Sequence, residues 1–285
     1  MYFPQVGITK GELLAYYHDV APFLLPHLRD RPLTLERYPE GVEGESFYQK
    51  DVPSYYPEWL RTFSKKYERA GKLVHHPLVD DLADLLYLVN LGTLTFHTIL
   101  ARIDDPTHPD VLVIDVDPPA AGDEEPSSAF DRAREAAHLL RDQLREEGLE
   151  PLVKTSGKRG LHLGLPLDGS LDFAQVRDVL ATLFEKAIAR RPELLTQEAR
   201  KEKRGDRVYL DALRMAHGAS VVPPYVVRPT PVASVSMPLT WEELDALEDP
   251  LVFTVRTAME RLREVGDLWA PLSLPGRSSV PPTGS

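Results

Sequence analysis

Two aspartates stand one residue apart in a strongly apolar stretch, residues 111–117, whose letters are VLVIDVD. The β-branched residues of this stretch favour a buried strand. Side chains two positions apart point to the same face of a strand, so Asp115 and Asp117 share one face, with Cα atoms about 6.6 Å apart. Two carboxylates beside a buried strand are costly unless something compensates their charge. The pattern fits an ion-paired strand end, a sugar-nucleotide site or a metal site for phosphoryl transfer, and the metal site is our hypothesis.

A third carboxylate would strengthen the metal interpretation, and Asp211 is the candidate. It lies in the stretch 207–213, RVYLDAL, which predicts a strand with Asp211 on the same face as Tyr209. The simpler interpretation is a strand-edge aspartate paired with Arg207 or Arg214. Three carboxylates on adjacent strands can hold two divalent ions about 4 Å apart, which would activate an attacking hydroxyl and stabilise a leaving pyrophosphate. Mg²⁺ and Mn²⁺ suit such all-oxygen ligands.

The stretch 154–162, KTSGKRGLH, predicts a loop that could hold phosphate groups. Its two glycines permit positive φ or a close approach of the backbone, and its lysine and arginine side chains supply positive charge. Ser156 adds a hydroxyl, and His162 adds a ring nitrogen at the start of the next strand. The stretch is not a Walker A loop, because the spacing differs and a strand follows it. An ordinary β-hairpin with a basic tip fits the same residues equally well.

The periodicity of the remaining sequence predicts alternating strands and helices. The expected helices cover 9–20, 57–70, 77–90, 128–147, 172–190 and 240–265, and a loop covers 120–128. The expected strands lie within 31–50 and at 93–100, 111–117, 151–155, 161–167, 207–213 and 219–222. From residue 111 onward the order is strand, helix, strand, hairpin, strand, helix, strand, which predicts a split βαβ sheet of the ferredoxin type. Residues 1–100 would form a smaller mixed lobe.

The composition is that of a globular protein without disulfide chemistry. The 285 residues are 42% hydrophobic and 27% charged, with a net charge of −11 and no cysteine. No apolar run reaches membrane-spanning length and the N-terminus lacks a signal-peptide pattern, so we expect a cytoplasmic protein. The acidic balance argues against unspecific coating of nucleic acid. Basic side chains nevertheless cluster at 61–72, 154–159 and 200–207, which permits a local basic groove.

Six segments carry a family resemblance, and they occur in family order along the chain. They are YYHDVAPFLLPHLRDRPLTLERYPEGVEGESFYQKDVP, YLVNLGTLTFH, HPDVLVIDVDPP, KTSGKRGLHLGLPL, RVYLDALRMAHGASVVPPYVVRP and VSMPLTWEEL. In them the chain resembles the polymerase domain of bacterial DNA ligase D, which belongs to the archaeo-eukaryotic primase superfamily and works in non-homologous end joining. The resemblance covers about residues 10–265. It implies a mixed α/β primase fold, in which a split-βαβ catalytic sheet resembling an RNA-recognition motif packs with the smaller N-terminal lobe.

The resemblance also implies three sets of functional residues. The metal-binding and catalytic residues would be Asp115, Asp117 and Asp211. The residues that contact the incoming nucleoside triphosphate would be His97, Ser156, Lys158, His162, Arg204 and Arg228. The residues that contact DNA would be Arg37, Phe47, Tyr48 and Lys50. Considered alone, the histidine in the strand 93–100 would be a core residue, and the two arginines would be surface residues.

Two positions depart from the family pattern. Met215 stands where an asparagine is common after the third aspartate, and a thioether cannot replace the hydrogen bonds of an amide. Glu36 stands beside Arg37 where basic residues are frequent, which bears on the expected phosphate contacts at the DNA end. All three aspartates are retained, so the resemblance still implies an active enzyme.

The expected function is template-directed transfer of nucleotides to a primer 3′-hydroxyl, with two divalent cations, Mn²⁺ or Mg²⁺, and nucleoside or deoxynucleoside triphosphates as substrates. The resemblance implies gap filling at double-strand breaks and a preference for ribonucleotides. The implied DNA partners are 5′-phosphorylated ends that are gapped or carry a 3′-overhang, and Ku and a DNA ligase are further candidates. We expect a monomer with no membrane partner. It would form one domain over 1–270, divided into 1–105, 106–235 and 236–270, with a disordered tail or linker at 271–285.

Three alternatives stay open at this stage. A stand-alone primase-polymerase of the same superfamily would make primers, and a primer-free synthesis assay separates it from a gap-filling enzyme. A glycosyltransferase with the same aspartate spacing would bind a sugar nucleotide and would not need the basic hairpin. A non-catalytic module would bind DNA ends or Ku without incorporating nucleotides.

Overall fold

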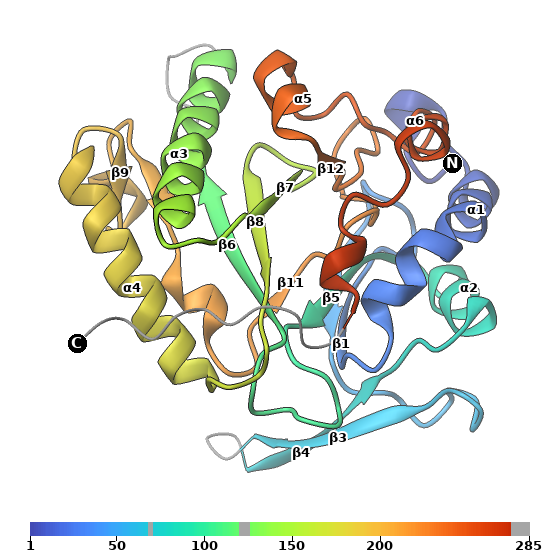
Figure 1. Cartoon of the computed structure of the whole chain (residues 1–285). Helices are drawn as coiled ribbons and strands as arrows, with labels where there is room; N and C mark the ends of the chain where they lie inside the picture. The colour runs from blue at the N-terminus through green and yellow to red at the C-terminus, as the bar shows by residue number, and fades with distance from the viewer. Residues whose placement is uncertain (68–70, 120–125, 275–285) are drawn as a thin grey trace. The chain divides into compact units, whose positions relative to one another are not determined.

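A computed structural model describes residues 1–67, 71–119 and 126–274, and the chain divides into two compact units (Figure 1). Unit 1 consists of Met1–Pro106, Ser220–Ser236 and Phe253–Asp267. Unit 2 consists of Thr107–Ala219, Met237–Val252 and the described residues from Leu268 onward. Residues 220–235, which the sequence assigns to the catalytic sheet, therefore belong to unit 1 instead.

The sheet of unit 2 contains the strand that carries the two aspartates. Its strand order is β12-β7-β8-β6-β10-β9. The strands are β6 (Val111–Asp117), β7 (Leu152–Thr155), β8 (Leu161–Pro166), β9 (Leu195–Thr196), β10 (Val208–Leu210) and β12 (Pro238–Leu239). β6 pairs antiparallel with both β8 and β10, and β7 pairs antiparallel with β8. Because helices follow β6 and β8, this arrangement is the predicted split βαβ sheet.

Two long helices cover this sheet. The helices of unit 2 are α3 (Pro126–Glu146), α4 (Phe173–Arg190) and α5 (Trp241–Ala246), with short 3₁₀ turns η3 (Lys201–Lys203), η4 (Ala212–Met215) and η5 (Ala270–Leu272). α3 contacts β6, β8 and β10, and α4 lies beside it (Figure 1). The stripe Ala133, Ala137 and Leu140 on α3 is fully buried, as its helical spacing predicts. α4 begins at a capping box formed by Asp172 and Gln175.

Unit 1 is built on a second antiparallel sheet with the order β11-β5-β1-β2. The strands of this unit are β1 (Leu33–Arg37), β2 (Phe47–Gln49), β5 (Thr93–Ile99) and β11 (Ser220–Val221), with a separate hairpin of β3 (Thr62–Tyr67) and β4 (Lys72–Pro77). The helices are η1 (Pro4–Val6), α1 (Lys10–Leu28), α2 (Leu82–Asn90) and α6 (Ala258–Val265). β5 lies between β1 and β11, and most of its side chains are buried.

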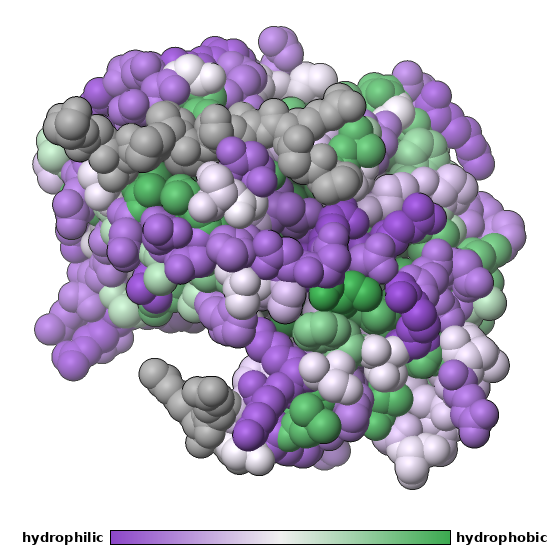
Figure 2. All heavy atoms as spheres, turned by 60° about the horizontal axis from the view of Figure 1, so that its bottom comes forward, coloured by the Kyte–Doolittle hydropathy of each residue, from purple (hydrophilic) through white to green (hydrophobic). Residues whose placement is uncertain are grey.

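Apolar side chains form the interior of each unit and also reach the surface in places. The face drawn in Figure 2 shows hydrophobic patches set among hydrophilic side chains. The exposed large side chains include four aromatic residues close together in sequence, Phe47, Tyr48, Tyr55 and Trp59. Exposed aromatic groups of this kind can serve as contact surfaces for a partner.

The structure corrects three sequence predictions in unit 1 and at the C-terminal end. The predicted helix 57–70 is wrong, because residues 62–67 form β3, with alternating exposed and half-buried side chains. The helix predicted at 9–20 continues to Leu28 through two prolines. The helical region predicted at 240–265 is two separate helices, α5 and α6. Much of the predicted loop 120–128 and of the predicted tail lies outside the described residues, at 120–125 and 275–285.

Candidate active site

The two aspartates lie at the end of β6, in the interior of the unit 2 sheet. Asp115 is paired with His162 on β8, and Asp117 is paired with Tyr209 on β10. Lys154 on β7 is in turn paired with His162. Directly opposed residues of antiparallel strands share a face, so Lys154, His162 and Asp115 form a row across three strands. His162, which follows the hairpin, therefore lies on the same face of the sheet as Asp115, as a site shared by the hairpin and the aspartates requires.

The carboxylate of Asp115 lies in a strongly perturbed environment. Its side chain is 16% exposed, whereas that of Asp117 is 47% exposed. Burial raises the pKa of Asp115 above its ordinary value, although the positive charge of Arg214 opposes the shift. The negative charges of Asp117 and Asp211 raise the pKa of Asp115 further. The three carboxylates therefore repel one another, and a bound cation would relieve that repulsion.

The third aspartate follows its strand rather than lying within it. β10 ends at Leu210, and Asp211 begins η4, where its Oδ1 accepts a hydrogen bond from the Leu213 amide at 2.9 Å. The predicted strand 207–213 is therefore too long at its C-terminal end. An aspartate side chain in such a cap position accepts hydrogen bonds from backbone amides that would pair with a neighbouring strand if the strand continued. Its other oxygen, Oδ2, lies 3.4 Å from Nε of Arg214.

Arg214 contacts two of the three carboxylates. Its Nε donates to Asp115 Oδ2 at 2.9 Å and also lies 3.4 Å from Asp211 Oδ2. The Arg214 side chain is 45% exposed, so the guanidinium reaches a buried carboxylate from a position open to solvent. The interpretation of Asp211 as the partner of a neighbouring arginine thus holds for Arg214. Arg207 instead donates to backbone carbonyl oxygens.

The donor set suits a hard divalent cation in its chemistry but not in its present spacing. Asp115, Asp117 and Asp211 offer only carboxylate oxygens, which are the ligands that Mg²⁺ and Mn²⁺ prefer. Among the residues that the structure describes, no three acidic, histidine or cysteine side chains lie close enough together to hold a metal ion. The guanidinium of Arg214 lies between Asp115 and Asp211 and supplies a positive charge there.

The loop between β7 and β8 is a tight hairpin organised by Ser156. The Ser156 amide donates to the carbonyl oxygen of Gly160 at 2.9 Å, and its Oγ accepts hydrogen bonds from the amides of Lys158 and Gly160, each at 3.2 Å. Gly157 has a φ of 72°, a conformation that glycine adopts without strain. A Cβ added to Gly160 would lie 2.7 Å from the carbonyl oxygen of Val116. The hairpin therefore lies directly against the end of β6, beside the aspartates.

Lys154 is a fully buried strand residue rather than part of the basic hairpin tip. Its Nζ lies 2.8 Å from Nδ1 of His162 and 5.3 Å from the centroid of the Trp269 ring. A lysine ammonium group only donates hydrogen bonds, so with Lys154 in that form Nδ1 of His162 would accept and Nε2 would carry the hydrogen of the neutral ring. That Nε2 lies 3.6 Å from Asp115 Oδ1. A charged Lys154 would thus fix which nitrogen of His162 can donate toward the carboxylate.

Arg204 is held firmly rather than lying loose on the surface. Its guanidinium donates to the carbonyl oxygens of Glu198 and Ala199, at 2.9 and 3.0 Å. It also lies 3.7 Å from the ring centroid of Tyr209, and its Nη1 is 3.7 Å from Asp117 Oδ2. The side chain is 12% exposed. These contacts place a fixed cation beside the more exposed of the two β6 aspartates.

Unit 1 contains a separate polar cluster around His97 on β5. Nε2 of His97 lies 3.3 Å from Glu36 Oε2, and the Tyr38 hydroxyl donates to Glu36 Oε1 at 3.0 Å. Burial alone would raise the pKa of Glu36, but hydrogen bonds and positive charge from His97 outweigh it, with help from Tyr38. Arg228 adds to the same effect, and the pKa of Glu36 lies below its ordinary value. Since Glu36 is 5% exposed, this departure from the family pattern is an internal pairing and not a change on an exposed surface.

The residues predicted to contact DNA differ in their accessibility. Phe47 and Tyr48, on the edge strand β2, are 45% and 64% exposed. Neither side chain faces a core, since both faces of this short edge strand are open. Lys50 is also exposed. Arg37 is 7% exposed; its guanidinium donates to Gln49 Oε1 at 2.6 Å and lies 5.2 Å from the Phe47 ring centroid, so it supports the aromatic pair from inside.

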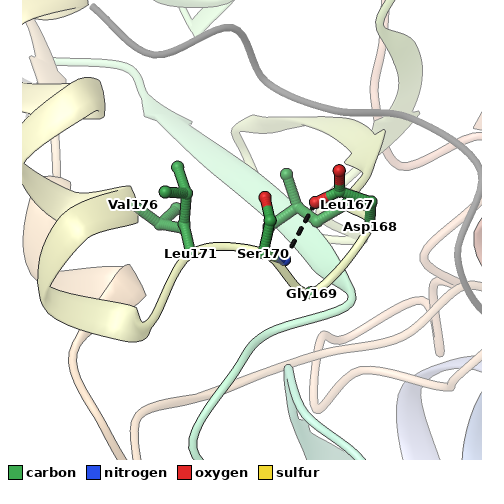
Figure 3. A pocket seen from close by; sticks show the side chains of 6 residues that line it. All are labelled: Leu167, Asp168, Gly169, Ser170, Leu171 and Val176. Carbon is green, nitrogen blue, oxygen red and sulfur yellow. Dashed lines mark hydrogen bonds between the residues drawn. The ribbon is translucent and has the colours of Figure 1, made fainter.

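A shallow depression lies on the turn between β8 and α4 (Figure 3). It is lined by Leu167, Asp168, Gly169, Ser170, Leu171 and Val176. Oδ1 of Asp168 accepts a hydrogen bond from the Ser170 amide at 2.9 Å, which closes the turn on itself. None of the predicted site residues lines this depression, and we assign it no function.

The predicted site residues thus fall into one set in each unit. Unit 2 holds Asp115, Asp117, Ser156, Lys158, His162, Arg204 and Asp211. Unit 1 holds Arg37, Phe47, Tyr48, Lys50, His97 and Arg228. Sequence reasoning offered Arg214 only as a partner of Asp211 and missed its contact with Asp115, and it missed the buried position of Lys154. The spacing of Arg214 three residues after Asp211 was a usable signal, whereas the role of Lys154 depends on the register of β7 with β8.

The helices of the described ranges include none that is both long and apolar enough to cross a membrane.

A family model described as "LigD, primase-polymerase domain" matches residues 9–269. Among solved structures, the "Polymerase Domain from Mycobacterium tuberculosis Ligase D in complex with DNA" is similar with a TM-score of 0.86 and 25% identity, over 97% of this chain and 96% of that chain. This similarity confirms the predicted mixed α/β fold of the archaeo-eukaryotic primase type.

Curated relatives match along most of this chain. "Bifunctional non-homologous end joining protein LigD" of Bacillus subtilis (strain 168) is 32% identical over 259 residues, which are 90% of this chain and 40% of that protein. "Multifunctional non-homologous end joining protein LigD" of Pseudomonas aeruginosa is 31% identical over 271 residues, which are 94% of this chain and 31% of that protein. The chain therefore spans less than half the length of these relatives.

Proposed function

Because the chain belongs to the LigD primase-polymerase domain family, we propose that it is a template-directed nucleotidyl transferase that extends the 3′-hydroxyl of a primer. The observation that carries the proposal is the grouping of three carboxylates at the end of β6: Asp115 and Asp211 both lie within 3.4 Å of Nε of Arg214. The negative charges of Asp117 and Asp211 also raise the pKa of Asp115. A hairpin with basic residues and a fixed arginine lie beside these carboxylates. Phosphoryl transfer from a nucleoside triphosphate needs both features, because the substrate is a polyanion that binds together with divalent cations.

Asp115, Asp117 and Asp211 would hold two divalent cations, Mn²⁺ or Mg²⁺. When bound, such ions lower the pKa of the attacking hydroxyl and neutralise charge on the departing pyrophosphate. The protein's part is to orient the carboxylate oxygens. Strand β6 fixes the first two side chains on one face, and the cap of η4 fixes the third through its Oδ1. The raised pKa of Asp115 reflects an environment in which a compensating cation is favoured over bare charge.

The hairpin and Arg204 would bind the triphosphate. The Ser156 Oγ accepts two backbone amides, which leaves its own hydrogen to donate to a phosphate oxygen. His162 offers the Nε2 hydrogen that Lys154 directs. Arg204 adds a positive charge whose orientation is already set by backbone carbonyl oxygens, so little side-chain freedom is lost on binding. His97 and Arg228 of unit 1 are proposed as further contacts to the nucleotide.

The proposed substrate is DNA with a 5′-phosphorylated end that is gapped or carries a 3′-overhang. Phe47 and Tyr48 present exposed rings on which template bases can stack, and Lys50 adds a positive charge that can contact the phosphate backbone of the DNA. The printed names of the relatives support a role in non-homologous end joining, so gap filling at double-strand breaks is the proposed task. Ribonucleotides are the proposed preferred substrate, and Ku and a DNA ligase are proposed partners of a monomer whose functional domain covers 1–270.

The experiment that tests the proposal is primer extension on a gapped template with a 5′-phosphate. It compares Mn²⁺ with Mg²⁺ and ribonucleotides with deoxynucleotides. We expect incorporation opposite the template base, with more product from ribonucleotides, and loss of product for Asp117→Ala in a folded protein. Extension at the wild-type rate by that variant contradicts the proposal. Synthesis without a primer would identify a primer-making enzyme instead, and DNA binding without incorporation would identify a non-catalytic module.

A further inference from the structure

The contacts of Arg214 suggest a part in metal binding that goes beyond its ion pairs. Its Nε lies 2.9 Å from Asp115 Oδ2 and 3.4 Å from Asp211 Oδ2. These are two of the three carboxylates proposed to hold divalent cations, and Arg214 approaches one oxygen of each. A metal ion would bind such oxygens at about 2.0–2.1 Å, well inside the space that the guanidinium now fills. Arg214 and a cation shared by these two oxygens therefore exclude each other.

We propose that Arg214 is a resident counter-ion that neutralises the carboxylates in the absence of metal, is displaced when a divalent cation binds, and then contacts the triphosphate. This inference rests on the proposed function. It assigns to one side chain the coupling between metal binding and nucleotide binding.

The structure gives a reason for such a counter-ion. Asp115 is 16% exposed, and its two acidic neighbours repel its charge. A partly buried carboxylate without a partner is costly, so an internal cation stabilises the metal-free protein. Arg204 and His162 lie farther from the carboxylates, at 3.7 Å from Asp117 Oδ2 and 3.6 Å from Asp115 Oδ1.

The same geometry permits the exchange. The Arg214 side chain is 45% exposed, so its guanidinium can leave the carboxylates for solvent or for a phosphate group. Asp211 uses Oδ1 for the Leu213 amide and Oδ2 for Arg214, so releasing the arginine leaves the cap of η4 intact. The planar guanidinium matches phosphate as well as it matches carboxylate.

Two consequences for binding follow from this exchange. Without nucleotide, Arg214 competes with the metal ion and lowers its affinity. With nucleotide, the released guanidinium gains a new partner, so each ligand strengthens the binding of the other. Removing the charge of Arg214 should therefore strengthen metal binding in the absence of nucleotide. It should also weaken the coupling between metal binding and nucleotide binding.

The test measures binding of Mn²⁺ directly, from the electron paramagnetic resonance signal of the free ion, with and without a non-hydrolysable ribonucleoside triphosphate. The variants are R214Q, R214K and D115A. The matched control is R190Q, because Arg190 on α4 is 44% exposed, pairs with Glu146 on α3, and loses the same charge. Thermal unfolding of each variant with and without Mn²⁺ is recorded in parallel.

An opposite charge within about 4–6 Å changes the affinity of a carboxylate for a proton tenfold or more, so we expect R214Q to bind Mn²⁺ about tenfold more tightly than wild type without nucleotide. Nucleotide should then increase Mn²⁺ affinity less in R214Q than in wild type. R190Q should behave as wild type. R214K keeps the positive charge, but its ammonium group is more strongly hydrated than a guanidinium and should pair less tightly with the partly buried carboxylates, so R214K should lie between wild type and R214Q. Metal-free R214Q should melt below R190Q, and Mn²⁺ should raise its melting temperature more.

Mn²⁺ binding by R214Q that is no tighter than that by R190Q overturns the inference, as does an unchanged effect of nucleotide. If R214Q does not fold without metal, R214K decides, since Mn²⁺ binding no tighter than wild type contradicts the exchange. When D115A abolishes Mn²⁺ binding but R214Q does not strengthen it, the proposed function stands and only the role of Arg214 fails. Absence of Mn²⁺ binding by the wild-type protein overturns both.

Discussion

Replacement of Gly160 by alanine tests whether the close approach of the hairpin to β6 sets the geometry of the site. The added Cβ would lie 2.7 Å from Val116 O, 3.2 Å from Pro118 Cδ and 3.6 Å from Asp117 Cα. The first and third of these atoms belong to the backbone of a paired strand and cannot rotate away. The hairpin must therefore move outward.

The size of the effect follows from this crowding. Overpacking of a well-packed position costs about 1–3 kcal/mol of unfolding free energy. A displacement of about 1 Å at a reacting centre can cost about 100-fold in rate. For G160A we therefore expect a loss of about 1–3 kcal/mol in stability and a fall of about 10- to 100-fold in kcat/KM for nucleotide incorporation.

Gly169 supplies the matched control for this prediction. It has a φ of 74° and no atom within 4 Å of its added Cβ, so G169A introduces backbone strain without a clash. The left-handed conformation costs a non-glycine residue about 1–2 kcal/mol, which is close to the loss expected for G160A. Denaturant unfolding and single-nucleotide extension are measured for both variants. Wild-type kcat/KM in G160A, or an equal fall in G169A, refutes the reasoning.

Three further predictions concern side chains around the two sites. Lys154→Met should lower the free energy of unfolding by about 1–3 kcal/mol, since the buried Nδ1 of His162 loses its Lys154 partner, and it should raise KM for the nucleotide because the His162 ring loses that orienting contact; steady-state kinetics with an unchanged KM would contradict this. The pKa of Glu36 is lowered on folding, so its stabilising effect is present above the ordinary glutamate pKa and is lost as pH falls through the lower folded value. Glu36→Gln should therefore weaken the loss of stability on acidification, measured by urea unfolding from pH 6 to pH 3, and an identical pH profile would count against the pairing. Phe47→Ala with Tyr48→Ala should weaken binding of gapped DNA by about 1–3 kcal/mol per stacked base, measured by fluorescence anisotropy, and undiminished DNA affinity would exclude a stacking role.

Local patterning predicts much of this fold because strand periodicity and helical stripes were strong around β6. The stretch 111–117 became β6 with the predicted bounds, and the order of elements after it yields the split βαβ sheet. The helix predicted at 57–70 was wrong. Pro57 and Gly71 are typical helix boundary residues, but the alternation in 62–67 is the stronger signal and indicates a strand.

The candidate site was predictable only where strand periodicity alone decides. The shared face of Asp115 and Asp117 follows from a period of two residues. The end of β10 before Asp211 does not, since it depends on a cap hydrogen bond within η4. The place of Arg214 beside Asp115 depends on how that turn lies against β6, and the contact of Lys154 with its histidine depends on strand register. Neither is visible before the tertiary structure is known.

The measurement that tests the central claim most directly is single-nucleotide extension on gapped, 5′-phosphorylated DNA in the presence of Mn²⁺. It uses the wild-type protein, the single alanine variants of Asp115, Asp117 and Asp211, and R190Q as the folded control. The account predicts incorporation by wild type and R190Q and background levels for each aspartate variant, with circular dichroism showing that all remain folded. Extension at the wild-type rate by any folded single aspartate variant would contradict the account, as would a wild-type protein that binds DNA and triphosphate but incorporates nothing.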